Sequence, residues 1–250
     1  MKIYDCFTFY NELDLLEIRL EELYNTVDHF VLVEATTTFT NRLKEMLFEK
    51  NKQRYSKYLD KIIYVPVDLP KSTNPWDNEK HQRNAIMQGL TNANPDDIII
   101  VSDCDEVLRS TAIESLRNSE QTLYALRMPL FNFKFNYMSL KSSRYDIWAM
   151  ATRRSVLNEL TPDSLRGMRF NFMGAGFQHQ DNGCQVIEHS GWHFGYLGDN
   201  QYLQDKARSF SHQEVNNPDF LNNIDVNASI REGKSWDRRE ENQFSIVNLD

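Results

Sequence analysis

The sequence predicts an α/β domain built on a mainly parallel central sheet flanked by helices, with a smaller antiparallel part. In the first half, short strands that are apolar on both faces alternate with helical segments, as in a parallel sheet covered on both sides. The second half holds a long aromatic segment with partial alternation, which is typical of antiparallel strands. We expect one domain over residues 1–250, divided into residues 1–120, residues 121–215 and a polar C-terminal extension at residues 216–250.

The parallel half is expected to contain four strands, each a short apolar run. After the first, a helix from about Asp14 places apolar residues on one face at helical spacing, namely Leu16, Leu20, Leu23 and Val27. Asn74 is a typical N-cap residue and Pro75 is typical of the first position in a helix, so we expect a helix to begin here and to reach about Leu90. Thr111 and Glu114 form a capping-box pattern for the next helix. The predicted strands are residues 2–9, 29–35, 61–67 and 97–102, and residues 42–59 are a polar, helix-prone segment.

The second half shows less regular patterning. Residues 122–138 form the long aromatic segment, and residues 147–154 are expected to pair with it. A short helix begins at Thr161-Pro162-Asp163, and another begins at about Asn200 with Leu203, Ala207 and Phe210 on one face. Between these helices, residues 167–195 hold six of the nine glycines and three of the six histidines, which indicates a binding loop.

Charge and composition argue against some classes of partner. The net charge is −8, from 28 Lys and Arg against 36 Asp and Glu, and the chain has no long basic run. Nucleic acids and anionic membrane surfaces are therefore poor candidate partners. Because the net negative charge of the protein repels anions, a phosphate-bearing ligand would need a metal ion or a few arginines at the binding site to hold it.

The cysteines and the hydropathy pattern bear on location. Cys6, Cys104 and Cys184 are far apart and form no C-x-x-C pair, which favours a reducing compartment. The first residues lead straight into a strand, and no apolar run reaches the length of about 18 residues that a membrane span needs. We therefore expect a cytoplasmic protein without a transmembrane segment.

Polar residues gather where the predicted parallel strands end. Because ligands bind at the carboxyl edge of such sheets, this edge is the candidate site. Asp103 and Asp105, separated by one residue, end the fourth strand, and oxygen ligands at this spacing suit Mg²⁺ or Mn²⁺. The alternative is that one acid caps the following loop and the other is solvated. The other strand ends carry Thr8, Phe9 and Tyr10, then Glu34, then Asp68.

Three further residues have both a functional and a structural interpretation. Glu34 could accept hydrogen bonds from a base or a ribose, or could cap a loop. Arg83, on a helix, could reach a pyrophosphate or a base edge, or could be a surface arginine. His193 is a candidate third ligand to a metal at Asp103 and Asp105. His189 and His193 are four residues apart, as in a zinc-binding pair on a helix, but Gly191 and the flanking glycines argue against a helix there.

The sequence lacks the motifs of several common enzyme classes. It has no G-x-G-x-x-G, no G-x-x-x-x-G-K-[ST] and no G-x-S-x-G, so dehydrogenase, P-loop and α/β-hydrolase interpretations lose their usual support. A nucleotidyltransferase acting on sugar phosphates would also use paired acids with a metal, but residues 7–14 have neither the glycines nor the lysine of its phosphate loop. A non-catalytic carbohydrate-binding protein is the third possibility.

Seven segments in order resemble glycosyltransferase family 17, which contains the β-1,4-mannosyl-glycoprotein β-1,4-N-acetylglucosaminyltransferases. They are NELDLLEIRLEEL, FVLVEATTTFTN, HQRN, SDCDEV, LTPDSLR, GWHFGYLG and KARSFSHQEVNNP, and they extend the resemblance over residues 1–218. The resemblance implies a GT-A-type nucleotide-sugar fold, a UDP-sugar donor (UDP-GlcNAc in characterised members), Mn²⁺ or a similar metal, and inversion at the anomeric carbon. This sequence differs from the family in one respect. Animal members carry a membrane anchor and a stem, and we expect neither from this sequence.

The resemblance also implies roles for individual residues. Residues 1–120 become the donor-nucleotide half and residues 121–215 the acceptor half, with a glycan or small hydroxyl compound as acceptor. An inverting transfer needs a carboxylate as general base, for which Glu188 and Asp146 are the candidates, with Glu188 preferred because it lies close to the GWHF histidine. The expected nucleotide contacts are Thr8, Phe9, Glu34, Arg83 and Asp103, and the expected metal ligands are Asp103, Asp105 and His193.

Overall fold

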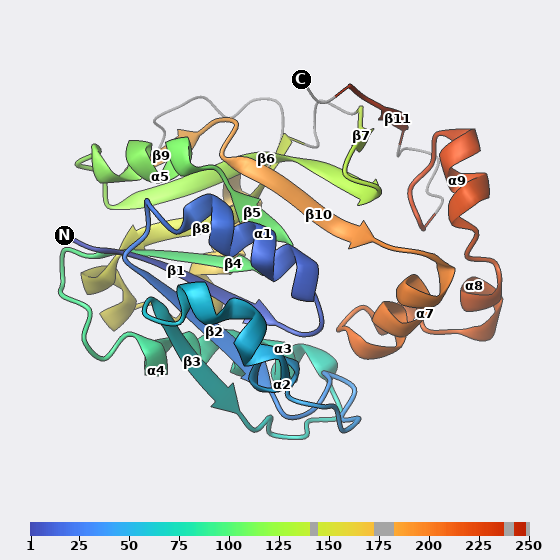
Figure 1. Ribbon diagram of the computed structural model, residues 1–250, viewed down its shortest axis with the longest axis horizontal. Coiled ribbons are helices and arrows are strands. Elements are labelled where there is room, and N and C mark those ends of the chain that lie inside the picture. The colour runs from blue at the N-terminus through green and yellow to red at the C-terminus, as the bar shows by residue number, and fades with distance from the viewer. Residues whose placement is uncertain (141–144, 173–182, 238–242, 249–250) are drawn as a thin grey trace.

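The structure is a computed structural model that describes residues 1–140, 145–172, 183–237 and 243–248, and within them eleven strands form one sheet (Figure 1). The main path runs β11-β7-β6-β8-β4-β1-β2-β3, and β5, β9 and β10 join it at the side. The strands are β1 (Ile3–Phe9), β2 (His29–Ala35), β3 (Ile62–Val67), β4 (Ile98–Asp103), β5 (Glu106–Leu108), β6 (Leu123–Phe133), β7 (Tyr137–Ser139), β8 (Tyr145–Arg153), β9 (Cys184–Ile187), β10 (Gly191–Leu197) and β11 (Phe244–Ile246).

The helices are short, and four segments of the described residues are 3₁₀-helices. The α-helices are α1 (Leu13–Leu23), α2 (Leu47–Asn51), α3 (Pro75–Asn84), α4 (Ile86–Gly89), α5 (Ser110–Arg117), α6 (Pro162–Gly167), α7 (Asn200–Ser209), α8 (Pro218–Asn222) and α9 (Val226–Glu232). The 3₁₀-helices are η1 (Lys52–Tyr58), η3 (Arg154–Asn158), η4 (Met168–Phe172) and η6 (Gln213–Val215).

The parallel half matches the prediction. β1 pairs in parallel with β2 and β4, and β2 pairs in parallel with β3. Alternate residues of β1 belong to separate buried clusters: Ile3 and Phe7 pack with the leucines of α1, whereas Tyr4 and Cys6 share a cluster with Ile86 of α4. Both faces of these strands are therefore covered, which is why they are apolar at almost every position and readable from the sequence.

Two helix predictions needed correction at their ends. The helix that begins after Asn74 ends at Asn84, and α4 continues after Ala85. α4 lies so close to the sheet that a Cβ on Gly89 would come 2.4 Å from Val31 Cγ1. The other correction is α5, which begins at Ser110, before the predicted cap at Thr111. Its first N–H is satisfied from elsewhere in the fold, because Ser110 N donates to Glu22 Oε1 of α1 at 2.8 Å.

The antiparallel part joins the parallel strands through β8. This strand pairs antiparallel with β6, as predicted for residues 147–154 and the aromatic segment, and it also pairs antiparallel with β4. The mainly parallel α/β class with a smaller antiparallel part is confirmed. The long segment is divided, since β6 ends at Phe133 and β7 starts at Tyr137. The predicted binding loop at residues 167–195 instead contains η4, β9 and β10, and its residues 173–182 lie outside the described part.

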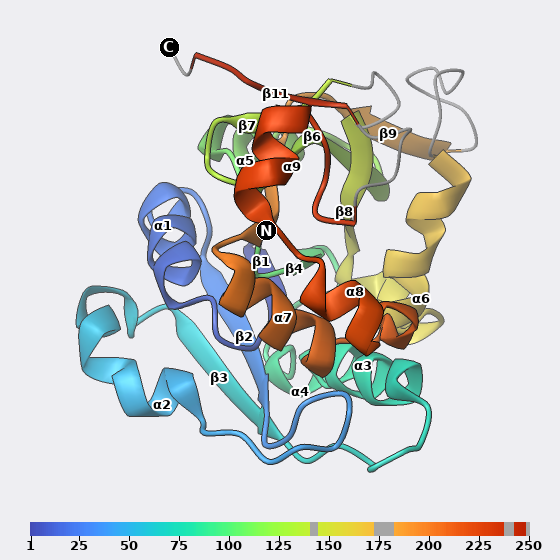
Figure 2. The ribbon, with the colours of Figure 1, turned by 90° about the vertical axis from the view of Figure 1, so that its right-hand side faces the viewer.

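The C-terminal residues are packed against the rest of the fold. α7 ends just before Phe210, and Trp236 and Phe244 lie in a buried cluster with Leu203 and Tyr137. Figure 2 shows α7, α8 and α9 on the side of the molecule that faces the viewer. Among the described residues, no helix has the length and apolar character needed to cross a membrane. The predicted cytoplasmic location stays a prediction.

Candidate active site

A cavity of about 820 Å³ lies at the carboxyl ends of β1 and β4, and we call it the strand-end cavity. Its walls come from these strand ends, the loop after β2, and α3, α6, η4, β10 and α7. Its volume is within the range of sites for nucleotide-sized ligands. The charged residues of its walls are Glu12, Lys44, Asp77, Glu79, Lys80, Arg83, Asp103, Asp105, Glu106, Asp163, Arg166, Arg169 and Lys206.

A fully buried arginine shapes the turn that carries Asp103 and Asp105. Arg19 of α1 donates to Asp5 Oδ2 at 2.7 Å and to Ser102 Oγ at 2.6 Å. It also donates to the carbonyl oxygens of Asp103 at 3.0 Å and Glu106 at 2.9 Å. The turn after β4 therefore wraps around a guanidinium group, which donates to two of its backbone carbonyl groups.

Asp103 is surrounded by donors. Its Oδ1 accepts from Thr8 Oγ1 and from Arg83 Nη2, both at 3.2 Å, and its Oδ2 accepts from Arg166 Nη2 at 3.2 Å. Burial opposes ionisation, but the positive charges of Arg83 and Arg166 hold the pKa of Asp103 far below its usual value. Both carboxylate oxygens are thus already occupied by protein donors.

Glu106 lies deeper than the two aspartates, and burial raises its pKa to about 8 despite the opposing charge of Arg166. Its Oε2 accepts from Asp103 N at 2.9 Å, and its Oε1 accepts from Arg166 Nη2. Glu106 therefore fixes the backbone of Asp103 and the position of the Arg166 guanidinium.

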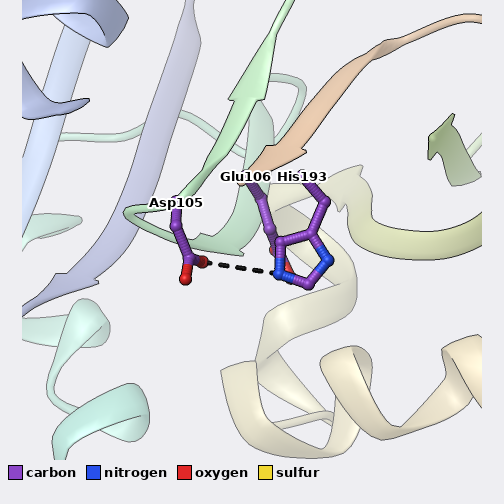
Figure 3. Close-up of side chains that lie close together, drawn as sticks. All are labelled: Asp105, Glu106 and His193. Atoms are coloured by element: carbon purple, nitrogen blue, oxygen red, sulfur yellow. Dashed lines mark ion pairs between the residues drawn. The ribbon is translucent and has the colours of Figure 1, made fainter. Parts of the chain in front are cut away.

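Asp105 faces a histidine on one side and a lysine on the other. Its Oδ1 lies 3.7 Å from His193 Nε2, and its Oδ2 accepts from Lys206 Nζ at 3.0 Å. Ligand atoms of Asp105, His193 and Glu106 all lie within 4.8 Å of one another (Figure 3). Burial lowers the pKa of His193 to about 4, so the imidazole is neutral at pH 7, the form that binds a metal.

The donor set around Asp105 fits a divalent cation. Carboxylate oxygens and a neutral imidazole nitrogen are ligands of Mn²⁺, and His193 Nδ1 is buried without a hydrogen-bond partner among the described residues. Asp103 was predicted to share this metal, but its oxygens face Thr8 and the arginines instead. The structure thus brings Asp105 and His193 together. Glu106 lies close to them, but its two oxygens accept from Asp103 N and Arg166, so it is occupied by protein donors as Asp103 is.

The predicted nucleotide contacts divide into two groups. Thr8, Phe9 and Arg83 line the cavity together with Asp103. Glu34 is not among the lining residues and is fully buried. Its carboxylate accepts from the backbone N–H groups that start α2, at 2.6 and 3.1 Å, and from the side chains of Lys44 and Tyr64. The described contacts of Glu34 are those of a carboxylate that caps the start of α2, a structural role in place of the loop cap considered for it.

The described structure places one of the two predicted general bases, Glu188, away from the cavity. Glu188 follows β9, accepts from Arg127 Nη1 at 2.8 Å and is absent from the cavity walls. Asp146 lies in β8 opposite Met128, and its side chain lies outside the described part.

Several charged residues that line the cavity were not predicted from the sequence, among them Glu12, Arg166, Arg169 and Lys206. Arg166 and Lys206 fall inside the motifs LTPDSLR and KARSF, but a lone cation in a polar helix is usually on the surface. The available signal was the acidic strand end itself, because buried carboxylates require positive partners from elsewhere in the chain.

The fold and the site define a class of protein: an α/β protein with a charged ligand cavity at the carboxyl edge of its sheet, built around an acidic pair. The profile of Glycosyltransferase family 17 matches residues 1–246, and the chain belongs to that family. This confirms the resemblance drawn from the motifs.

Curated relatives agree with the family. The β-1,4-mannosyl-glycoprotein 4-β-N-acetylglucosaminyltransferase of Homo sapiens is 26% identical over 136 residues, which cover 49% of this chain and 26% of the human protein. The Rattus norvegicus protein of the same name is 26% identical over 136 residues, covering 49% of this chain and 25% of the rat protein. The chain thus spans about a quarter of the length of the curated relatives that it matches.

Two solved structures are similar at low identity. One is a 4-diphosphocytidyl-2C-methyl-D-erythritol synthase with a TM-score of 0.43 and 12% identity, covering 82% of this chain and 97% of that chain. The other is the galactosyltransferase LgtC in complex with donor and acceptor sugar analogs, with a TM-score of 0.40 and 9% identity, covering 75% of this chain and 73% of that chain.

Proposed function

We propose that this chain is a metal-dependent inverting glycosyltransferase that moves N-acetylglucosamine from UDP-GlcNAc to a hydroxyl group of a glycan or a small acceptor. Membership of glycosyltransferase family 17 carries the proposal, and the names of the curated relatives support the choice of sugar. The strand-end cavity supports it further, because its size suits a nucleotide sugar and its acidic pair lies at the carboxyl edge of a parallel sheet.

In this proposal Thr8, Phe9 and Arg83 contact the nucleotide, and Asp105 and His193 hold the cation. The bound cation would neutralise the negative charge that develops on the departing diphosphate. Lys206 adds a positive charge beside Asp105, and Arg166 adds another beside Asp103. Both are held in place by protein acceptors before the ligand arrives, so little reorganisation is needed during transfer.

The experiment that tests the function is a calorimetric titration with UDP, in Mn²⁺ and in EDTA, followed by an assay of UDP release from UDP-GlcNAc. A glycosyltransferase of this kind binds UDP more tightly in Mn²⁺ and releases UDP faster when an acceptor is present. Sugar binding that is indifferent to UDP and to metal would instead identify a carbohydrate-binding protein. Pyrophosphate release from UTP and a sugar phosphate would identify a nucleotidyltransferase.

We propose Glu12 as the general base that takes the proton of the acceptor hydroxyl. Its carboxylate lines the cavity, and its Oε2 accepts from the backbone N–H groups of Tyr10 and Asn11, both at 3.0 Å. Burial raises the pKa of Glu12, against the lowering effect of Lys206, which brings this carboxyl closer to the range of an effective base.

The expected result is that Glu12→Gln lowers kcat about a hundredfold, a typical contribution of general base catalysis. Since the base acts when deprotonated, wild-type activity should fall as the pH drops through the raised pKa of Glu12, and this acid limb should vanish in the variant. Glu188→Gln is the matched control, because Glu188 lies outside the cavity walls, and it should retain activity within about twofold of wild type. Full activity of Glu12→Gln together with loss of activity in Glu188→Gln would instead support Glu188 as the general base.

A further inference from the structure

Arg166 carries more hydrogen-bond donors than the protein around it uses. This residue of α6 lines the strand-end cavity and is 3% exposed. Its Nη2 donates to Asp103 and Glu106, whereas Nε and Nη1 are buried and have no partner among the described residues. Three N–H bonds of one buried guanidinium are thus left without an acceptor, at a cost that an anionic ligand would remove.

This surplus is larger than that of other arginines in the described chain. Arg83, which is also buried and lines the cavity, lacks a partner only at Nε. Arg127 and Arg154 also have an unpartnered Nε, but each uses a terminal nitrogen for a side-chain acceptor, and neither has a buried terminal nitrogen without a partner. Neither lines the cavity. An isolated Nε is therefore an ordinary feature of this fold, and the unpartnered terminal nitrogen of Arg166 is what distinguishes it.

Arg169, three residues further on in η4, is a second cation in the same wall of the cavity. Its Nε is buried without a partner, and its guanidinium lies 4.8 Å from the centre of the Phe170 ring. No carboxylate of the described residues forms an ion pair with it. Burial, and next the charge of Arg166, lower the pKa of Arg169 to about 10, so it remains charged at pH 7.

We propose that Arg166 and Arg169 form an anion subsite that binds the diphosphate of a nucleotide ligand independently of the cation at Asp105. The identification of the anion as a nucleotide diphosphate rests on the proposed function. A diphosphate suits the geometry because two guanidinium groups present several donors, and each can bind phosphate oxygens in a bidentate manner. The subsite adjoins the acidic turn, since Arg166 is already bonded to Asp103.

The subsite is tested by calorimetry in EDTA, with UDP, uridine and inorganic pyrophosphate as separate probes. The wild-type protein should bind UDP at least about tenfold more tightly than uridine, because charge-assisted hydrogen bonds to the phosphates are retained without metal. Pyrophosphate alone should bind measurably. Equal affinity for UDP and uridine in EDTA, or no binding of pyrophosphate, would overturn the proposal.

Two variants and one control assign the binding to these side chains. Arg169→Met should lower the affinity for UDP and pyrophosphate in EDTA by about tenfold and leave uridine unchanged. Arg166→Lys keeps the positive charge next to Asp103 and Glu106 but removes the planar guanidinium group with its paired N–H donors. It should show a similar loss of affinity. Arg154→Met is the control, because Arg154 shares the unpartnered Nε but lies outside the cavity.

The outcomes separate this inference from the proposed function. Arginine-dependent pyrophosphate binding without any sugar transfer would keep the anion subsite and reject the glycosyltransferase. Sugar transfer from UDP-GlcNAc with unchanged kinetics in Arg169→Met and Arg166→Lys would keep the enzyme and reject the subsite. Thermal unfolding of each variant, compared with wild type, confirms that the measured protein is folded.

Discussion

Asp105→Asn is expected to lower kcat for sugar transfer by about a thousandfold, equivalent to about 4 kcal/mol of transition-state stabilisation. The carboxylate faces His193 through one oxygen and Lys206 through the other, so its charge organises the cation site and holds the lysine. Asparagine keeps the shape of the side chain and removes the charge. The measurements are the rate of GlcNAc transfer at saturating Mn²⁺ and the affinity for Mn²⁺, which should fall in parallel.

Asp77→Asn is the matched control for this substitution. Asp77 also lines the strand-end cavity, but its carboxylate accepts from Ser72 Oγ at 2.8 Å and from Asn74 Nδ2 at 3.3 Å at the start of α3. Its rate should stay within about twofold of wild type, as is usual for a surface substitution away from the reaction. Wild-type activity and Mn²⁺ affinity in Asp105→Asn would refute the role of Asp105, and so would equal losses in both variants.

The parts of the fold that could be predicted are those in which one physical constraint acts at every position. The strands β1, β2 and β4 are buried on both faces, so an apolar run identified each of them to within one or two residues. The start of α5 could not be found in this way, because its first N–H is satisfied by Glu22 from a distant part of the sequence. Local capping patterns carry no information about such tertiary caps.

The same reasoning separates the site residues that could be found from those that could not. Thr8, Asp103 and Asp105 were found because the ends of neighbouring parallel strands meet at one edge. Glu34 also ends a buried strand, but a carboxylate at that place can equally cap a helix, and its described contacts are with the start of α2. Arg166 was missed because it comes from a short helix, where an arginine is normally exposed.

Arg19→Met is expected to destabilise the protein by about 3–5 kcal/mol, the cost of breaking a buried ion pair from one side. The substitution leaves the Asp5 carboxylate, which is fully buried, without its cation. It also removes donors from Ser102 Oγ and from the carbonyl groups of Asp103 and Glu106. Urea denaturation followed by circular dichroism measures the change in the free energy of unfolding.

Arg54→Met is the matched control, because Arg54 also bonds two carboxylates, those of Asp14 at 2.6 Å and Glu17 at 2.8 Å, but on the surface. Its side chain is 36% exposed, and its loss should cost no more than about 1 kcal/mol. The double variant Arg19→Met, Asp5→Leu should recover much of the lost stability, since it leaves no buried charge unpaired. If Arg19→Met cost no more than Arg54→Met, the buried network would contribute little to folding.

This prediction links stability to the active site, because the bonds of Arg19 end on the turn between the two aspartates. The apolar strand β4 leads into Asp103, Asp105 and Glu106, and such acids are costly at the end of a buried strand unless cations meet them. The cations are Arg83 and Arg166 for Asp103 and Lys206 for Asp105, while Arg19 holds the backbone beneath them. Arg19→Met should therefore also lower kcat at temperatures at which the variant is still folded, whereas Arg54→Met should not.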